Sequence, residues 1–155
     1  MVTALVDNLG VAAPTGERTF PRAAAMAEAG PDFYRDIARA GYRGAYLRTL
    51  AEDVASGALD LEELNDPDVS DDEVEERLLA LPGVGPYAAA HVMLTSLGRY
   101  HRLVLDSWTR PTYAKLAGRN ASDKTIERKF RRYGDFSGLA FWLLLTRTWV
   151  PENPN

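Results

Sequence analysis

"LPGVGPYAAAHV", residues 81–92, is the stretch that decides the fold. Two prolines in it preset φ, while Gly83 and Gly85 tolerate a positive φ and carry no side chain. An alanine-rich run follows at once, so the pattern predicts a turn between two helices. The first amides of the second helix lack intrahelical partners and lie at the positive end of its dipole, which lets an anion approach the bare backbone. A plain corner between two helices would also account for the glycines.

The rest of the chain is also patterned as helices. Apolar residues recur at three- and four-residue spacing, and no strand-like alternation persists. We therefore predict an all-α multi-helix bundle of eight or so short helices, in which Ser70 or Asp71 caps the helix before the turn and Ser122 caps a later one. The apolar run over 137–150 predicts a helix buried all round. The predicted segments are 1–9, 21–30, 31–41, 42–57, 71–79, 86–98, 107–118, 123–134 and 137–150.

Length and composition narrow the class of protein. A chain of 155 residues, 46% hydrophobic and 26% charged, predicts one domain over 1–155. Its parts are a helix-hairpin-helix over about 72–98, a loop over 99–110 and closing helices over 111–150. No apolar run reaches the ~18 residues that span a membrane. The absence of cysteine excludes disulfides, a thiolate nucleophile and a cysteine-bound metal or iron–sulfur cluster. We expect a cytoplasmic protein, associated with the nucleoid if bacterial.

Charge is distributed unevenly along the chain. The net charge is −4, but residues 51–80 hold twelve acids and one base, whereas residues 99–132 hold ten bases and three acids. A nucleic-acid footprint depends on the charge of one face, not of the whole chain. The basic segment is thus either a solvated helical face or a surface that follows phosphates, with the acidic run turned away.

At this point the motifs resemble a known family. "LPGVGPYAAA" is followed, 21 residues after Gly85, by "LDSWTR" at 105–110. This combination resembles the helix-hairpin-helix (HhH-GPD) superfamily of base-excision DNA glycosylases, in its branch without an iron–sulfur cluster. The segments "ARAGYRGAYLRTLAEDVASG" and "YGDFSGLAFWLLLTR" also look like parts of that fold. The resemblance covers most of the chain.

The resemblance implies an activity and two catalytic positions. The family hydrolyses the N-glycosidic bond of a damaged or mispaired base flipped out of duplex DNA. Asp106 matches the family's aspartate, which stabilises the positive sugar and orients or deprotonates water; it can also be the N-cap of the next helix. Tyr87 stands where bifunctional members have a Schiff-base lysine, so a monofunctional enzyme is implied. Its ring either lines the cleft or packs against the linker.

The resemblance also implies a DNA-binding set and a cation site. Trp108 occupies a position where many members have a histidine that contacts phosphate. No cofactor is required, apart from a structural Na⁺ or K⁺ held at the hairpin by backbone carbonyls. The partner is double-stranded DNA with a damaged or mispaired base, no membrane is involved, and a monomer is expected. The cation would be held by the carbonyls of Leu79, Leu81 and Val84. The residues expected at DNA phosphates are Pro82, Gly83, Val84, Gly85, Tyr87, Ala88 and Arg110.

One departure from the family leaves alternatives open. Members usually have a further N-terminal region that supplies base-recognition residues, so the chain is expected to be an N-terminally truncated or unusually short member. A non-catalytic DNA-binding module, or an inactive fragment of such an enzyme, is the alternative function. A third hypothesis for the function is a helical domain that binds other proteins.

Overall fold

The computed structural model describes residues 1–149, which are helical apart from loops and one isolated bridge between Ala12 and Arg18. The predicted all-α class is therefore confirmed. The chain divides into two compact units, Met1–Asp66 with Leu81–Gly83, and Pro67–Ala80 with the chain from Val84 onward. Each unit is described by itself below, and the single domain expected over 1–155 stays a prediction.

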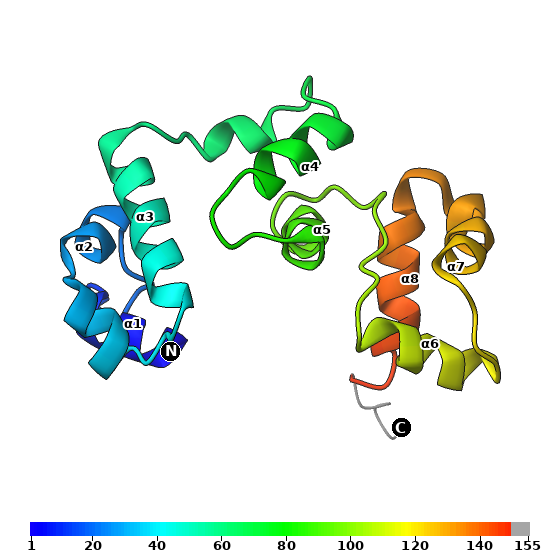
Figure 1. Ribbon diagram of the computed structural model, residues 1–155, viewed down its shortest axis with the longest axis horizontal. Helices are drawn as coiled ribbons and strands as arrows, with labels where there is room; N and C mark the ends of the chain where they lie inside the picture. The colour runs from blue at the N-terminus through cyan, green and yellow to red at the C-terminus, as the bar shows by residue number, and fades with distance from the viewer. Residues whose placement is uncertain (150–155) are drawn as a thin grey trace. The chain divides into compact units, whose positions relative to one another are not determined.

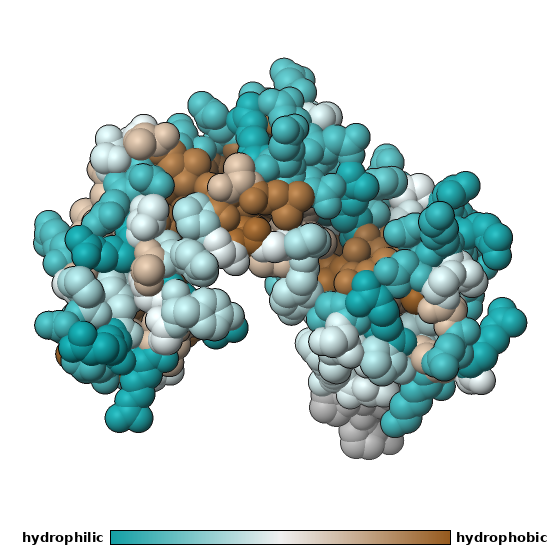
Figure 2. Space-filling view, in the orientation of Figure 1, coloured by the Kyte–Doolittle hydropathy of each residue, from teal (hydrophilic) through white to brown (hydrophobic). Residues whose placement is uncertain are grey.

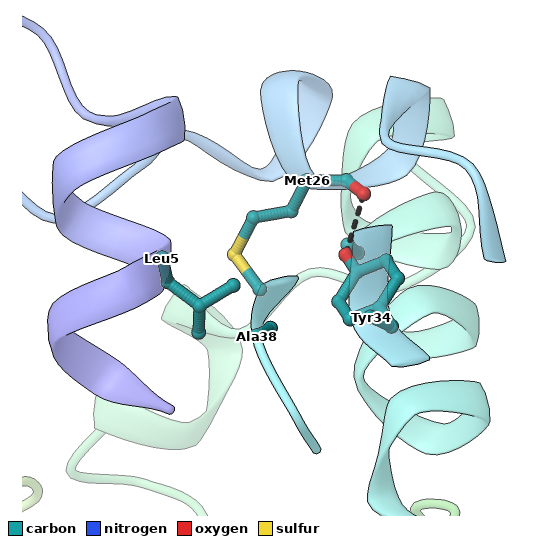
Figure 3. Packing of buried hydrophobic residues seen from close by; sticks show 5 residues of the cluster. Leu5, Met26, Tyr34 and Ala38 are labelled. Atoms are coloured by element: carbon teal, nitrogen blue, oxygen red, sulfur yellow. Dashed lines mark hydrogen bonds between the residues drawn. The ribbon is translucent and has the colours of Figure 1, made fainter. Parts of the chain in front are cut away.

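Unit 1 is built around α3, against which α2 packs (Figure 1). Its core residues come from four helices and a short connection, and the Tyr34 hydroxyl donates a hydrogen bond of 2.6 Å to the Met26 carbonyl (Figure 3). The buried polar end of Tyr34 is thus satisfied. The elements are α1 (Val2–Leu9), α2 (Ala23–Glu28), the π-helix η1 (Phe33–Ile37), α3 (Arg43–Ser56) and the 3₁₀-helix η2 (Glu62–Asn65). The core cluster is Leu5, Met26, Tyr34, Ala38 and Ala51.

Unit 2 is built around α8, and α5 and α7 lie on either side of it (Figure 1). Phe141 and Leu145 of α8 pack with α6 and α7, whereas Leu139 and Trp142 pack with α5. The helix that follows the turn and the basic helix therefore contact different faces of α8. The elements are α4 (Asp71–Leu79), α5 (Pro86–Thr95), α6 (Thr109–Ala117), α7 (Asp123–Phe130), the 3₁₀-helix η3 (Arg131–Phe136) and α8 (Ser137–Thr146).

Several helix ends follow the predicted punctuation. Gly57 and Gly118 end α3 and α6 in the left-handed conformation, with φ of 76° and 70°. The Ser70 hydroxyl accepts the Glu73 amide at 3.3 Å and caps α4 as predicted. Ser122 occupies the predicted cap position of α7, but its hydroxyl pairs with that of Thr125 at 3.0 Å instead of with a free amide.

Two predictions for helices were wrong. The segment over 31–41 forms a helix that ends at Ile37 and includes a π turn, in which the Ala38 amide donates to the Phe33 carbonyl at 2.9 Å. The closing helix is not buried all round, because Leu143 is 58% exposed, although Phe141 and Leu145 are buried. Val150, the last residue of that predicted helix, lies outside the described residues.

Across residues 1–149, no helix is both long enough and apolar enough to cross a membrane.

Candidate DNA-binding and catalytic site

The two glycines in the turn between α4 and α5 differ in backbone conformation and in the space around them. Gly83 has a φ of +77°, and a Cβ there would overlap the Tyr46 ring, lying 2.9 Å from its Cγ. Glycine is therefore required at 83 by both backbone and packing. Gly85 has an ordinary extended conformation, with φ −105° and ψ 179°, and a Cβ there would meet no atom within 4 Å. Nothing within the described chain requires glycine at position 85.

The start of α5 exposes amides that an anion could reach. Gly85 is the N-cap, Pro86 is the first helical residue, and the Ala89 amide makes the first helical bond, 2.9 Å to the Gly85 carbonyl. The amides of Tyr87 and Ala88 therefore precede the first intrahelical bond, and no side chain caps them. With the helix dipole behind them, these amides favour a negative partner.

Asp106 lies at the end of the linker between α5 and α6, where it caps the following turn. Its Oδ1 accepts the amides of Trp108 and Thr109 at 2.9 and 2.6 Å. In return, the Thr109 hydroxyl accepts the Asp106 amide at 2.7 Å, and Thr109 is fully buried. This reciprocal pair is a capping box. It fixes the carboxylate, and both amide hydrogen bonds use the same oxygen, Oδ1.

The same contacts keep Asp106 ionised. Partial burial, the largest single influence, raises the pKa of the carboxyl group. The hydrogen bonds from Thr109 and Trp108, together with the positive charge of Arg110, outweigh burial and lower the pKa of Asp106 below its ordinary value. At neutral pH the group is a carboxylate, as a partner for a developing positive charge must be.

Two arginines at the beginning of this linker form ion pairs with acids of α4. The largely buried Arg99 donates to the Val69 carbonyl at 2.9 Å and to Asp71 at 2.8 Å. Arg102 pairs with Asp72 and, at 2.9 Å, with Glu75. Our hypothesis of one basic surface over 99–132, with the acidic run turned away from it, needs correction here. These two bases are bound to the acids of α4.

The linker is also held against the start of α8. The amides of Gly138 and Leu139 donate to the Tyr100 carbonyl at 2.7 and 3.2 Å. A Cβ at Gly138 would overlap the Arg102 carbonyl and lie 2.8 Å from the Tyr100 carbonyl oxygen. Val104, farther along, is 1% exposed in the cluster with Ala90 and Leu94 of α5. The segment that carries Asp106 is therefore fixed to α4, α5 and α8.

Aromatic rings form a continuous surface beside Asp106. Tyr87, 50% exposed, stacks on His91 with ring centroids 5.6 Å apart, and His91 meets the Trp142 edge at 5.2 Å. Trp142, Trp108 and Trp149 contact one another pairwise at 5.7–5.9 Å. The backbone amide of Trp108 also donates to Asp106, so the carboxylate is bound to a residue whose ring belongs to this surface.

The structure thus brings Tyr87 and Asp106 into one unit, linked through His91, Trp142 and Trp108. Sequence reasoning missed the contributions of Tyr46, Trp142 and Gly138. Tyr87 and His91 are four residues apart on one helix, which predicts that their rings lie on the same face. Nothing in the local sequence predicts which ring of α8 packs against them.

The remaining predicted site residues are placed as follows. Arg110 forms a bidentate ion pair with Asp123 at 2.8 and 3.0 Å, half-exposed to solvent. Leu79 ends α4, and Leu81, Pro82 and Val84 lie in the turn. The backbone carbonyls of Leu79, Leu81 and Val84 are oxygens, the type of donor that hard cations prefer. The roles of these residues stay predictions.

The chain is similar in sequence and in structure to several known proteins. No protein-family model matches the chain. A probable N-glycosylase/DNA lyase from Methanothermobacter thermautotrophicus is 30% identical over 99 residues, which are 63% of this chain and 31% of that protein. A complex of MBOgg1 with a low-affinity DNA ligand superposes with a TM-score of 0.77 at 26% identity, over 96% of this chain and 53% of that one.

A second solved structure gives the same result. It is the 8-oxoguanine glycosylase/lyase of Clostridium acetobutylicum bound to double-stranded DNA with cytosine opposite 8-oxoguanine. Its TM-score is 0.76 at 26% identity, over 95% of this chain and 52% of that one. The chain therefore spans about half the length of these structures and about a third of the curated relative. The chain is thus similar in sequence and in fold to DNA glycosylases, which agrees with the resemblance of its hairpin motif and spaced aspartate to the helix-hairpin-helix (HhH-GPD) superfamily.

Proposed function

We propose that this chain hydrolyses the N-glycosidic bond of a damaged or mispaired base that is flipped out of duplex DNA. The observation that carries the proposal is the ionised, capped carboxylate of Asp106, held beside an aromatic surface in the same unit. The likeness to DNA glycosylases supports the same reaction class. The protein would act in the cytoplasm as a monomer, without a membrane.

The chemistry requires a group of this kind. As the bond between C1′ and the base nitrogen breaks, the base leaves with the bonding electron pair and the sugar becomes oxocarbenium-like. The Asp106 carboxylate stabilises that charge and accepts a proton from the water that attacks C1′. The extruded base needs a surface on which to stack, and aromatic side chains serve this purpose in enzymes that flip bases. The exposed rings of Tyr87, Trp108 and Trp149 offer one.

Tyr87 supports a reaction that uses water alone. A Schiff base requires an amine, and a phenol cannot form one. Of the three lysines of unit 2, Lys115 lies in the last turn of α6 and Lys124 and Lys129 lie on α7, where Lys129 sits over the Tyr113 ring at 5.3 Å. We expect that borohydride added during reaction with a lesion duplex will trap no covalent complex with the unmodified chain. A trapped complex would show that the enzyme is bifunctional.

The turn supports phosphate binding that does not depend on sequence. A phosphate that approaches Gly85 would meet no side chain there and could accept the amides of Tyr87 and Ala88. Pro82, Gly83 and Val84 would shape the turn, and Arg110 would add a charge at its exposed ion pair. A Na⁺ or K⁺ held by the carbonyls of Leu79, Leu81 and Val84 would add positive charge; no other cofactor is proposed.

Asp106→Asn tests the catalytic step. Asparagine is an equally good N-cap, so the fold and duplex binding should be kept. Loss of the carboxylate should slow base release by at least about 100-fold. The measurement is single-turnover release from a panel of lesion-bearing duplexes, followed by alkali treatment to reveal abasic sites. Normal release by the variant would refute the role of Asp106, and tight binding without release by the unmodified chain would favour a non-catalytic DNA-binding module.

A further inference from the structure

Seven of the ten bases over residues 99–132 form two sets in the structure, and Lys115, Arg119 and Arg131 belong to neither. Arg99, Arg102 and Arg110 form ion pairs with carboxylates. Four others lie on α7 and η3, are exposed, and make no ion pair with any acid among residues 1–149. We call these four the α7 basic row: Lys124, Arg128, Lys129 and Arg132.

Helix geometry places the row on one surface. Lys124, Arg128 and Arg132 follow one another at four-residue spacing, which is about one turn, and Lys129 lies next to Arg132 at three-residue spacing. The opposite side of α7 is buried through Ile126 and Phe130. Figure 2 shows largely hydrophilic side chains over α7. The row is therefore the outer face of a helix anchored by its apolar side.

The nearby acids are turned elsewhere. Asp123 is bound to Arg110. Glu127 and Asp135 line a pocket of about 350 Å³ together with His101, Arg102 and Arg131, on the side of the linker. Among residues 1–149 the row makes no ion pair with these acids, although the whole chain is acidic.

Two of the four cations are also held in place. The Lys129 ammonium lies 5.3 Å from the Tyr113 ring centre, and the Arg132 guanidinium lies 4.9 Å from the Tyr133 ring centre and donates to its hydroxyl at 2.9 Å. A cation that is already positioned loses less conformational entropy when it meets an anion.

The row is separate from the turn. α7 packs on Phe141 and Leu145 of α8, whereas α5 packs on Leu139 and Trp142 (Figure 1). We infer that the α7 basic row is a second contact surface for the phosphates of duplex DNA, distinct from the amides at the start of α5. The inference rests on the proposed function only in taking duplex DNA as the partner. A row of uncompensated cations suits the regularly spaced phosphates of a duplex, and such contacts read no sequence.

The test is the salt dependence of binding to an undamaged duplex by the full chain. Each phosphate contact contributes about 0.9 to the slope of log Kobs against log salt. Lys124→Gln with Arg128→Gln removes two cations that make no structural contact. We expect the slope to fall in magnitude by about 1–2 between about 50 and 200 mM KCl, with at least about tenfold weaker binding at the low end.

Lys115→Gln with Arg119→Gln is the matched control, because it makes the same charge change in unit 2 outside the row. An unchanged slope in the row variant would overturn the inference, and so would an equal fall in the control, since net charge would then be the cause. Absence of duplex binding by the unmodified chain would overturn it as well. A row-dependent slope without any base release would refute the proposed function alone.

Discussion

At the scale of single residues, Asp106 is both a helix cap and the candidate catalytic group. Its hydrogen bonds and the charge of Arg110 favour the ionised form in the folded protein. Ionisation of Asp106 therefore adds stability that is present above the unfolded pKa, about 3.9, and is lost as pH falls through the lower folded pKa. The capping role and the catalytic role require the same charge state.

This gives a prediction for the titration of Asp106. Carboxyl ¹³C shifts followed by NMR should show its midpoint below the ordinary range for aspartate. Arg110→Gln should raise the pKa, because one favourable charge is removed, whereas Arg119→Gln should leave it unchanged. A midpoint at or above the ordinary value would show that burial prevails over the hydrogen bonds.

The two glycines of the turn should respond differently to alanine. Gly83→Ala forces a side chain into the left-handed region at about 1–2 kcal/mol and into the Tyr46 ring, so the free energy of unfolding should fall by more than that. Gly85→Ala should cost at most about 1 kcal/mol, since its space is open and its φ is ordinary.

Duplex binding should separate the same two variants. Gly85→Ala should weaken DNA binding while the protein stays folded, because a methyl group would stand where a phosphate approaches. Denaturant unfolding and fluorescence anisotropy together check both glycines. Undiminished binding by Gly85→Ala would argue that the turn is a plain corner.

At the scale of elements, the linker between α5 and α6 depends on Gly138 for its path. Gly138→Ala should place a methyl group on the Arg102 carbonyl, so either the linker or the start of α8 must move. We expect a loss of about 1–3 kcal/mol in the free energy of unfolding. Because the linker carries Asp106, base release should fall more than duplex binding does.

A matched substitution separates these effects. Gly118→Ala is strained by its φ of +70° but meets no neighbouring atom and lies after α6, away from the linker. It should lower stability without a selective loss of base release. Equal effects of Gly118→Ala and Gly138→Ala on the ratio of release to binding would contradict the positioning role of the linker.

At the scale of the whole molecule, the acidic and basic segments are partly complementary. Arg99 and Arg102 compensate acids at the start of α4, and Arg110 compensates Asp123. Of the bases over 99–132 without an ion pair among residues 1–149, four form the α7 basic row. If the proposed partner is duplex DNA, a chain of net charge −4 would bind it through local surfaces, and the affinity should depend strongly on salt.

The sequence by itself determined the features that act over a few residues. The helical class, the glycine stops at Gly57 and Gly118 and the cap at Ser70 follow from backbone freedom and free amides next to them in the chain. The hairpin motif and the spacing to Asp106 predicted the likeness to DNA glycosylases, and the capping role of Asp106 was also foreseen.

Only the tertiary structure decided what depends on distant segments. The π turn accompanies the burial of Tyr34, Gly83 is confined by Tyr46, and Gly138 is confined by the linker. The pairing of Arg99 with Asp71, across 28 residues, removed a base from the expected phosphate surface. Local rules describe the options of each segment, but packing between segments far apart in sequence determines which charges are neutralised and which rings meet.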